Sequence, residues 1–396
     1  MNPSEIELSP KRKTCVVTST RADYGLFRRL IKFIDSSDNF ELQLIVTGSH
    51  LSKIFGETYK EIEADGFTIN RKIDLLLVSD TPVGLAKSAS LGLMGFGDAF
   101  DSLNPDLVVV LGDRFEILSA VNAAMLARIP IAHLHGGEST EGVIDEAIRH
   151  SITKCSHLHF VSNEVYRKRV IQLGENPKTV FNVGGLGVDA IRNINLLSKS
   201  ELENSLSIKF KNKNLLITFH PVTLEKNTSL SQMSELLDSL SDLEDTCLIF
   251  TMPNADTDGR IIFELIDSFV SKNMNAHVFT SLGQLRYLSC IAQVDAVVGN
   301  SSSGLAEVPS FKKATINIGD RQKGRIQSDS VINCNPISAD IKDAIKKSYT
   351  DQFKNLLLTV ENPYGDGGAA KRIINILSTV DMESLIHKEF YDLDLK

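Results

Sequence analysis

Two hydrophobic patterns alternate along the first half of the chain. Short apolar runs, which fit buried strands, are separated by longer stretches in which apolar residues recur at helical spacing. Strands that alternate with helices in this way predict a parallel α/β sheet. The predicted strands lie at residues 15–19, 42–48, 107–111, 129–133, 158–161 and 180–183. The predicted helices lie at residues 24–34, 53–64, 83–103, 116–126, 144–155 and 164–173.

The same alternation starts again after a break. Gly184 and Gly185 open a polar stretch that continues to residue 214 without a strand pattern, which predicts a domain boundary. The second series has predicted strands at residues 215–220, 247–252, 276–280, 296–300 and 314–319, and predicted helices at 231–240, 260–270, 284–291 and from Ser302 onward. A last helix is predicted at residues 369–380.

We therefore expect an α/β protein with two doubly wound, Rossmann-like domains that face each other across a cleft. The predicted division is a flexible tail at 1–13, an N-terminal domain at 14–186, a C-terminal domain at 187–368, and a segment at 369–396 whose helix packs back on the N-terminal domain. A length of 396 residues suits two domains of ordinary size.

Charge and composition narrow the possible partners. A net charge of -8 and a pI near 5.7 argue against a general binder of nucleic acid or of acidic membranes. The first residues, MNPSEIELSPKRK, lack the apolar core of a signal peptide, and no later run reaches about 18 apolar residues. These features predict a cytoplasmic protein with no membrane partner.

Nothing in the sequence predicts a metal or a cofactor. The five cysteines are far apart and show no CxxC spacing, which argues against a zinc site and against a disulfide framework. No Walker loop occurs, and no group of aspartates has the spacing of a metal cage. The first βα turn, TSTRADYG, is not GxGxxG, so a dehydrogenase is set aside.

Polar residues follow the predicted strands, where doubly wound domains bind ligands. Polar residues scattered at random would not follow strand ends so consistently. Their placement at strand ends therefore predicts a ligand site in the cleft. The residues at strand ends are Arg21, Asp23, His50, Asp113, Arg114, Glu138, His220, Asn254 and 300–303.

One stretch, PIAHLHGGESTEGVIDEAIRH at residues 130–150, gathers acids, a guanidinium and imidazoles around a single turn. A strand delivers Glu138 to the rim of the sheet, and Asp145 and Arg149 share one face of the next helix. This density suits acid-base chemistry. Taken alone, each acid also fits a plainer role, with Asp145 as a helix cap and Glu138 as a solvated loop residue.

Two other turns suit phosphate. Arg21 at a helix start combines a guanidinium with free backbone N–H groups, although a surface arginine explains that turn equally well. In VVGNSSSGLAEVPS, small hydroxylated residues including Ser301 and Ser302 run from a strand into a helix, and Glu307 can reach sugar hydroxyls beside a phosphate. A serine cap with an exposed glutamate explains one serine, not three followed by glycine.

Further positive charge and one histidine complete the predicted site. Arg321 and Arg325 lie four residues apart after another strand, in position to add charge to a diphosphate. Among several histidines at strand ends, His220 in FHPVT lies in the second domain and is expected to face the carboxylates across the cleft.

Seven of these segments resemble one enzyme family. In chain order, TSTRADYG, the LGDR around Asp113, HGGE, DEAIRHSITK, FHPVT, GNSSSGLAEVPS and ATINIGDRQKGR are similar to segments of the hydrolysing UDP-N-acetylglucosamine 2-epimerases of bacterial sialic acid synthesis. The resemblance covers residues 14–329 and extends toward the C-terminal helix. Each segment alone is a weak signal, but seven in order are specific.

The resemblance implies a fold like the two-domain GT-B glycosyltransferases and a reaction in which UDP-GlcNAc and water give N-acetylmannosamine and UDP without a cofactor. In the family, removal of the C2 proton expels UDP, and water then adds with inversion at C2. By motif, Asp113, Glu138 and Asp145 are the acid-base carboxylates, and His220 acts near the leaving diphosphate. The implied ligands of UDP and sugar are Arg21, Arg114, Asn254, Ser301, Ser302 and Arg321, with Glu307 on the ribose. Arg325 joins them only through its position after the same strand as Arg321.

Three alternatives stay open. Relatives of the family act on UDP-2,4-diacetamido-2,4,6-trideoxyglucose for legionaminic acid synthesis, and the sequence does not show which sugar is used. A GT-B glycosyltransferase needs an acceptor site instead of clustered acids, and a silent nucleotide-sugar sensor needs no acids at all.

Asp145 stands where the non-hydrolysing branch carries Glu. Our hypothesis is that the shorter Asp side chain leaves room for a water molecule. By analogy with relatives, we expect a homodimer or homotetramer.

Overall fold

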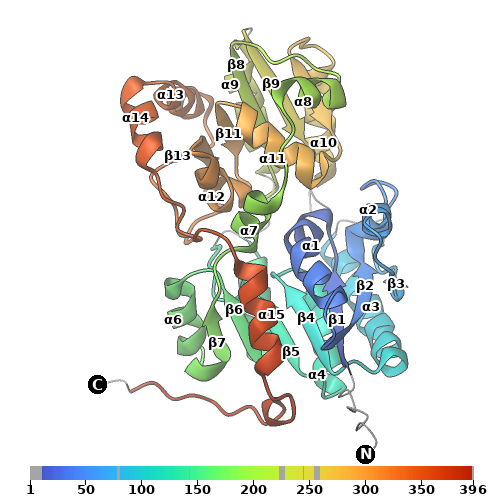
Figure 1. Ribbon diagram of the computed structural model, residues 1–396. Coiled ribbons are helices and arrows are strands. Elements are labelled where there is room, and N and C mark those ends of the chain that lie inside the picture. The colour runs from blue at the N-terminus through green and yellow to red at the C-terminus, as the bar shows by residue number, and fades with distance from the viewer. Residues whose placement is uncertain are drawn as a thin grey trace, which may run out of the picture.

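The protein is described by a computed structural model that covers residues 11–77, 81–141, 143–222, 228–243, 245–253 and 259–394. Two α/β domains lie one above the other, and the N-terminal domain is the lower one in Figure 1. Each domain is built on a sheet whose printed strand pairs are all parallel. The predicted fold class, two parallel α/β domains, is confirmed.

The N-terminal sheet has seven strands in the order β3-β2-β1-β4-β5-β6-β7. Its strands are β1 (Arg12–Thr18), β2 (Phe40–Thr47), β3 (Arg71–Ile73), β4 (Leu107–Leu111), β5 (Ile131–Leu134), β6 (Leu158–Val161) and β7 (Val180–Asn182). The helices that join them are α1 (Arg21–Asp35), α2 (Tyr59–Ala64), α3 (Pro82–Leu103), α4 (Phe115–Leu126), α5 (Asp145–Cys155) and α6 (Glu164–Gln172).

Helices cover both faces of this sheet, so its central strand β4 is apolar throughout. Every residue of β4 is buried. On one face, Val16 and Val109 share a core with Phe27 of α1. On the other face, Val108 packs in a core with Phe96 of α3. These apolar side chains therefore fill both faces of the sheet, and polar side chains such as Asp113 follow the strand ends.

The C-terminal sheet has six strands in the order β10-β9-β8-β11-β12-β13. They are β8 (Lys213–Thr218), β9 (Thr246–Thr251), β10 (Ala276–Phe279), β11 (Ala296–Gly299), β12 (Ala314–Ile318) and β13 (Val331–Cys334). The helices of this domain are α8 (Lys199–Leu206), α9 (Ser229–Ser241), α10 (Gly259–Val270), α11 (Gly283–Gln293), α12 (Ser303–Ala306), α13 (Ser338–Ser348) and α14 (Asp351–Thr359).

Two helices lie where the chain crosses between the domains, α7 (Leu186–Asn193) and α15 (Ala369–Thr379) (Figure 1). The buried face of α15, which includes Ile373 and Leu377, lies in the same core as Phe27 of the N-terminal domain. Asp189 of α7 accepts hydrogen bonds from the N–H groups of Gly368 (2.7 Å) and Ala370 (3.0 Å). This carboxylate therefore ties the start of α15 to the first crossing.

Several elements of the structure were not predicted from the sequence. They are β3 and β13, which are short edge strands, α7 and α8, which lie in the stretch predicted as the domain boundary, and α13 and α14, which follow the last predicted strand. The helix predicted at 53–64 is wrong in its first half, because Gly56 and Glu57 have φ of 86° and 48° and the helix begins only at Tyr59. No helix among the described residues is long and apolar enough to cross a membrane.

Candidate active site

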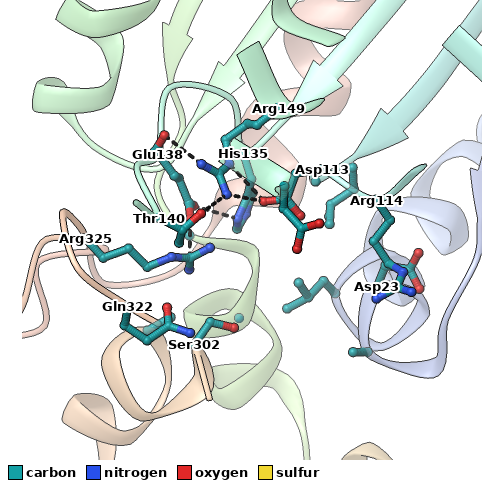
Figure 2. Close-up of a pocket in the computed structure, with 18 of the residues that line it drawn as sticks. Asp23, Asp113, Arg114, His135, Glu138, Thr140, Arg149, Ser302, Gln322 and Arg325 are labelled. Carbon is teal, nitrogen blue, oxygen red and sulfur yellow. Dashed lines mark hydrogen bonds and ion pairs between the residues drawn. The ribbon is translucent and has the colours of Figure 1, made fainter. Parts of the chain in front are cut away.

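A cavity of ≈ 190 Å³ lies between the domains at the carboxyl ends of β1, β4 and β5 (Figure 2). Acids and cations of the N-terminal domain face loops of the C-terminal domain across it. The N-terminal domain contributes Asp23, Asp113, Arg114, His135, Glu138, Thr140, Asp145 and Arg149. The C-terminal domain contributes Ser302, Glu307, Arg321, Gln322 and Arg325. Because the resemblance described above implies a nucleotide sugar, we use the label sugar cavity for this space.

Arg149 of α5 organises the N-terminal wall of the sugar cavity. Its side chain is 1% exposed, so its charge must be balanced by neighbours. The guanidinium donates to Asp113 (Nε to Oδ2, 2.9 Å), to Glu146 (Nη1 to Oε2, 2.6 Å), to the carbonyl of Glu138 (3.0 Å) and to the hydroxyl of Thr140 (2.6 Å). These bonds hold Asp113 at the end of β4 and fix the loop that carries Glu138.

Glu138 is held between an imidazole and a guanidinium. Its Oε1 lies 3.3 Å from Nδ1 of His135, and its Oε2 lies 2.9 Å from Nη1 of Arg325. Burial by itself raises the pKa of this carboxyl, but the charge of Arg325 and the hydrogen bond from His135 outweigh it and hold the pKa at about 2. Glu138 is therefore a carboxylate at neutral pH, and both of its oxygens are engaged.

The turn that follows β5 sets this geometry. His135 has a φ of 65°, and Gly137 has a φ of 76°. A Cβ atom on Gly137 would lie 2.5 Å from the carbonyl oxygen of Tyr166, so only glycine fits there. Nε2 of His135 accepts the N–H of Leu186 at 3.3 Å, which leaves its Nδ1 proton for Glu138.

A second cavity of ≈ 230 Å³, here called the nucleotide cavity, opens in the C-terminal domain beside the first. Arg21 of α1 reaches it from the N-terminal domain and donates to the hydroxyl of Ser281. Residues that line both cavities include Ser302, Glu307 and Arg321. The other polar residues around the nucleotide cavity include Thr218, His220, Gln284, Tyr287, Ser301 and Ser303.

Asn300 connects the parts of this second cavity. Its side chain accepts the N–H of His220 (2.7 Å) and donates to the carbonyl of His220 (2.8 Å). Its own carbonyl accepts from Arg321 (3.1 Å) and Gln322 (2.8 Å). The preceding Gly299 lies so close to β8 that a Cβ would sit 2.0 Å from the carbonyl oxygen of Thr218. The turn after β11 thus places His220, Arg321 and Gln322 together.

Glu307 lies where the two cavities meet. Burial raises the pKa of its carboxyl to about 7, against the opposing influence of His135. A Cβ atom on Gly187 would lie 2.3 Å from Oε1 of Glu307, so a glycine at the first domain crossing makes room for this carboxyl. From this position the Glu307 carboxyl can contact the hydroxyl groups of a ligand that spans both cavities.

The structure distributes the residues proposed from the sequence over both cavities. Asp113, Arg114, Glu138, Asp145 and Arg325 line only the sugar cavity, whereas Arg21, His220 and Ser301 line only the nucleotide cavity. Arg325 was expected beside a diphosphate, yet it contacts Glu138. Asn254 lies outside the described residues.

Several residues of the site were missed as functional candidates. Gln322 was not considered, and His135 was passed over in favour of His220 although it directly follows β5. Glu146 binds Arg149 and also lies 3.0 Å from Nε2 of His150. The strand-end rule points to His135, but no sequence signal marks Gln322. Among the described residues, no group of three His, Cys, Asp or Glu side chains can hold a metal ion.

Two parallel α/β domains with a polar cleft between them define a protein of the GT-B-like class. The family model described as UDP-N-acetylglucosamine 2-epimerase matches residues 32–378. This chain therefore belongs to the UDP-N-acetylglucosamine 2-epimerase family.

Two similar proteins agree with this assignment, and one solved structure shares the fold. It is 46% identical to the GDP/UDP-N,N'-diacetylbacillosamine 2-epimerase (hydrolyzing) of Campylobacter jejuni, over 97% of this chain and 100% of that protein. It is 40% identical to the polysialic acid biosynthesis protein P7 of Escherichia coli, over 96% and 98%. The crystal structure of UDP-GlcNAc 2-epimerase from Neisseria meningitidis bound to UDP-GlcNAc matches with a TM-score of 0.79 at 16% identity, over 92% and 99%. At that identity the match shows the fold alone.

Proposed function

We propose that this protein is a hydrolysing 2-epimerase of a nucleotide-linked 2-acetamido sugar. The observation that carries the proposal is the sugar cavity, where Asp113, Glu138 and Asp145 face one space beside a nucleotide cavity lined by Ser301, Ser302 and Arg321. Three acids suit proton transfers at a sugar ring, and a hydroxylated turn with an arginine suits a diphosphate. A glycosyltransferase does not require such a group of acids.

The proposed reaction has two steps. In the first, a base takes the C2 proton, the C–H electron pair forms a C1=C2 double bond, and the C1–O bond breaks with its electron pair on the nucleoside diphosphate. In the second, water adds its oxygen to C1, and a proton is delivered to C2 on the opposite face. The products are the nucleoside diphosphate and a free 2-acetamido sugar with inverted C2, and no electrons are gained or lost.

The contacts of the three acids suggest how they divide the work. Both oxygens of Glu138 are engaged by His135 and Arg325, which makes Glu138 a poor base. We assign it to positioning these two groups, and we assign the proton transfers to Asp113 and Asp145. Arg321 and the turn at 301–303 stabilise the departing diphosphate. His220, held by Asn300 in the nucleotide cavity, is placed to act at the same diphosphate.

For the sugar, we propose N,N'-diacetylbacillosamine, carried on UDP or GDP. The support is the 46% identity over the full length to a Campylobacter jejuni enzyme named for that substrate. UDP-GlcNAc, which the sequence analysis put first, is the second candidate. It is favoured by the 40% identity to a protein named for polysialic acid biosynthesis, since sialic acid is made from N-acetylmannosamine.

The test is proton NMR of the purified protein in D2O with each nucleotide sugar in turn. Release of the nucleoside diphosphate together with a free 2-epimeric sugar that carries deuterium at C2 is the expected result. Turnover of the diacetamido substrate in preference to UDP-GlcNAc supports the first candidate, and the reverse preference supports the second. Absence of turnover with all three substrates overturns the proposed function.

A further inference from the structure

The loop that follows β12 crosses from one domain to the other. Its first part stays with its own domain, because Arg321 and Gln322 donate to the carbonyl of Asn300. Its second part contacts the N-terminal domain, where the carbonyl of Lys323 accepts the N–H of Glu141 at 3.0 Å and Arg325 pairs with Glu138 at 2.9 Å. Figure 2 shows Arg325 reaching toward Glu138 and Thr140 from the opposite side of the cavity. We call residues 321–326 the bridging loop.

The last residue of the bridging loop is enclosed by two tyrosines. The N–H of Ile326 donates to the hydroxyl of Tyr166 (3.1 Å), and the hydroxyl of Tyr364 donates to the carbonyl of Ile326 (3.2 Å). The two phenol oxygens are 3.2 Å apart. Because Tyr364 has one proton and gives it to Ile326, Tyr166 donates to Tyr364. The three bonds form a closed ring around the backbone N–H and C=O groups of one residue, Ile326.

The two tyrosines come from parts of the chain that fix the N-terminal side of the cleft. Tyr166 lies on α6 and is 0% exposed, and Tyr364 lies on the second domain crossing and is 1% exposed. The carbonyl of Tyr364 accepts the N–H of Gly185 at 2.8 Å, which ties it to the first crossing. Burial raises the pKa of both phenols, so both remain proton donors across the usable pH range.

We propose that Tyr166 and Tyr364 are positioning residues that dock the bridging loop on the N-terminal domain and thereby hold Arg325 against Glu138. The role of this ion pair in turnover rests on the proposed function, whereas the docking itself does not. Tyr364 also lines the sugar cavity, whereas Tyr166 does not. The ring fixes the bridging loop at one backbone position, next to the residue whose guanidinium completes the sugar cavity.

The experiment compares Tyr166→Phe and Tyr364→Phe with the matched control Tyr349→Phe. Tyr349 also donates its hydroxyl to one acceptor, Asp295 at 3.2 Å, but it lies at the end of α13, and neither cavity includes it. Gly324→Ala should also loosen the bridging loop, because a Cβ at residue 324 would lie 2.7 Å from the hydroxyl oxygen of Ser139. Hydrogen exchange of the 321–327 backbone is measured without ligand, and kcat/KM is measured from pH 5 to 9.

We expect faster exchange at 321–327 in both ring variants and in Gly324→Ala, with no change in Tyr349→Phe. We expect kcat/KM to fall about tenfold in each ring variant, the effect of losing a buried hydrogen bond, with little further loss in the double variant because one ring is broken in each case. The acidic limb of the profile of kcat/KM against pH should also shift to higher pH, because a loosened Arg325 no longer keeps the pKa of Glu138 low.

Unchanged exchange at 321–327 in folded ring variants overturns the docking role, whatever the enzyme does. Unchanged kcat/KM and an unchanged acidic limb overturn the positioning role. The two proposals fail separately, because a protein that turns over none of the nucleotide sugars contradicts the proposed function while the exchange measurement still decides whether the tyrosines dock the loop.

Discussion

Arg325 of the C-terminal domain lies 2.9 Å from Glu138 of the N-terminal domain, and neither side chain is more than 12% exposed. This ion pair connects the two domains across the cavity that holds the other acids. Charges buried in this way require their partner, since removing one member of a buried pair leaves an uncompensated charge and costs about 3–5 kcal/mol. The state of this pair therefore affects both the stability and the chemistry of the protein.

We predict that Arg325→Met destabilises the protein less at low pH than at high pH. In the wild type, Glu138 has a lowered pKa, so its stabilising effect is present at neutral pH and is lost only as the pH falls toward about 2. Without Arg325, burial raises that pKa, so the folded variant binds a proton more readily than the unfolded chain. Urea unfolding at pH 5 and pH 8 should show a smaller gap between wild type and variant at pH 5.

Lys323→Met serves as the control for that comparison. Its ammonium group lies 3.8 Å from Glu141, and both side chains are more than half exposed, so little stability depends on the pair. We expect this variant to unfold like the wild type at both pH values. A gap for Arg325→Met that is equal at pH 5 and pH 8 contradicts the assigned coupling between Arg325 and Glu138.

The buried guanidinium of Arg149 predicts a different outcome for a conservative change. Arg149→Lys keeps the charge, but an ammonium group cannot serve acceptors on Asp113, Glu146, Thr140 and the Glu138 carbonyl at once. We expect a loss of about 3 kcal/mol or more in the free energy of unfolding, as for other broken buried charge networks. Arg28→Lys, on an arginine whose side chain is 47% exposed, should cost little by the same urea measurement.

The contacts of Asn300 lead to a prediction about the affinity for UDP. Asn300→Ala removes both side-chain bonds to the backbone of His220 and frees the end of β8 beside the nucleotide cavity. We expect the affinity for UDP to fall about tenfold, since two buried hydrogen bonds that shape the site are lost. The dissociation constant for UDP is measured by calorimetric titration. The control is Asn333→Ala, which lies on the edge strand β13 and should bind UDP as the wild type does.

The strand-end positions were predictable from the sequence because central strands of a parallel sheet are buried on both faces. Their apolar runs are continuous, as in β4, and a polar residue such as Asp113 marks where the run ends. The edge strand β3 carries the exposed Arg71 and Lys72, so it lacks that signal. Local pattern therefore predicts the interior of each sheet better than its edges.

The pairing of residues across the cleft was not predictable in the same way. Arg321 and Arg325 were expected together beside a diphosphate because they follow the same strand only four residues apart. The segment after β12 is irregular, so Arg321 turns to Asn300 and Arg325 turns to Glu138 of the other domain. Such a contact depends on how the two domains meet, which no local pattern encodes.

Glu307 predicts a pH dependence that a single substitution should remove. Its pKa is raised from an ordinary 4.5 to about 7, so its effect on stability is absent below pH 4.5, where the carboxyl is neutral in both the folded and unfolded chain. As the pH rises from 4.5 through 7, the unfolded chain ionises first and the folded protein loses stability relative to it. The shift corresponds to no more than about 3 kcal/mol, since Glu307 faces a water-accessible cavity.

The measurement is urea unfolding of Glu307→Gln from pH 5 to 8. Its free energy of unfolding should decline less with rising pH than that of the wild type. Glu361→Gln, at an exposed position, should follow the wild type. Parallel curves for wild type and Glu307→Gln contradict a protonated Glu307 in the folded protein.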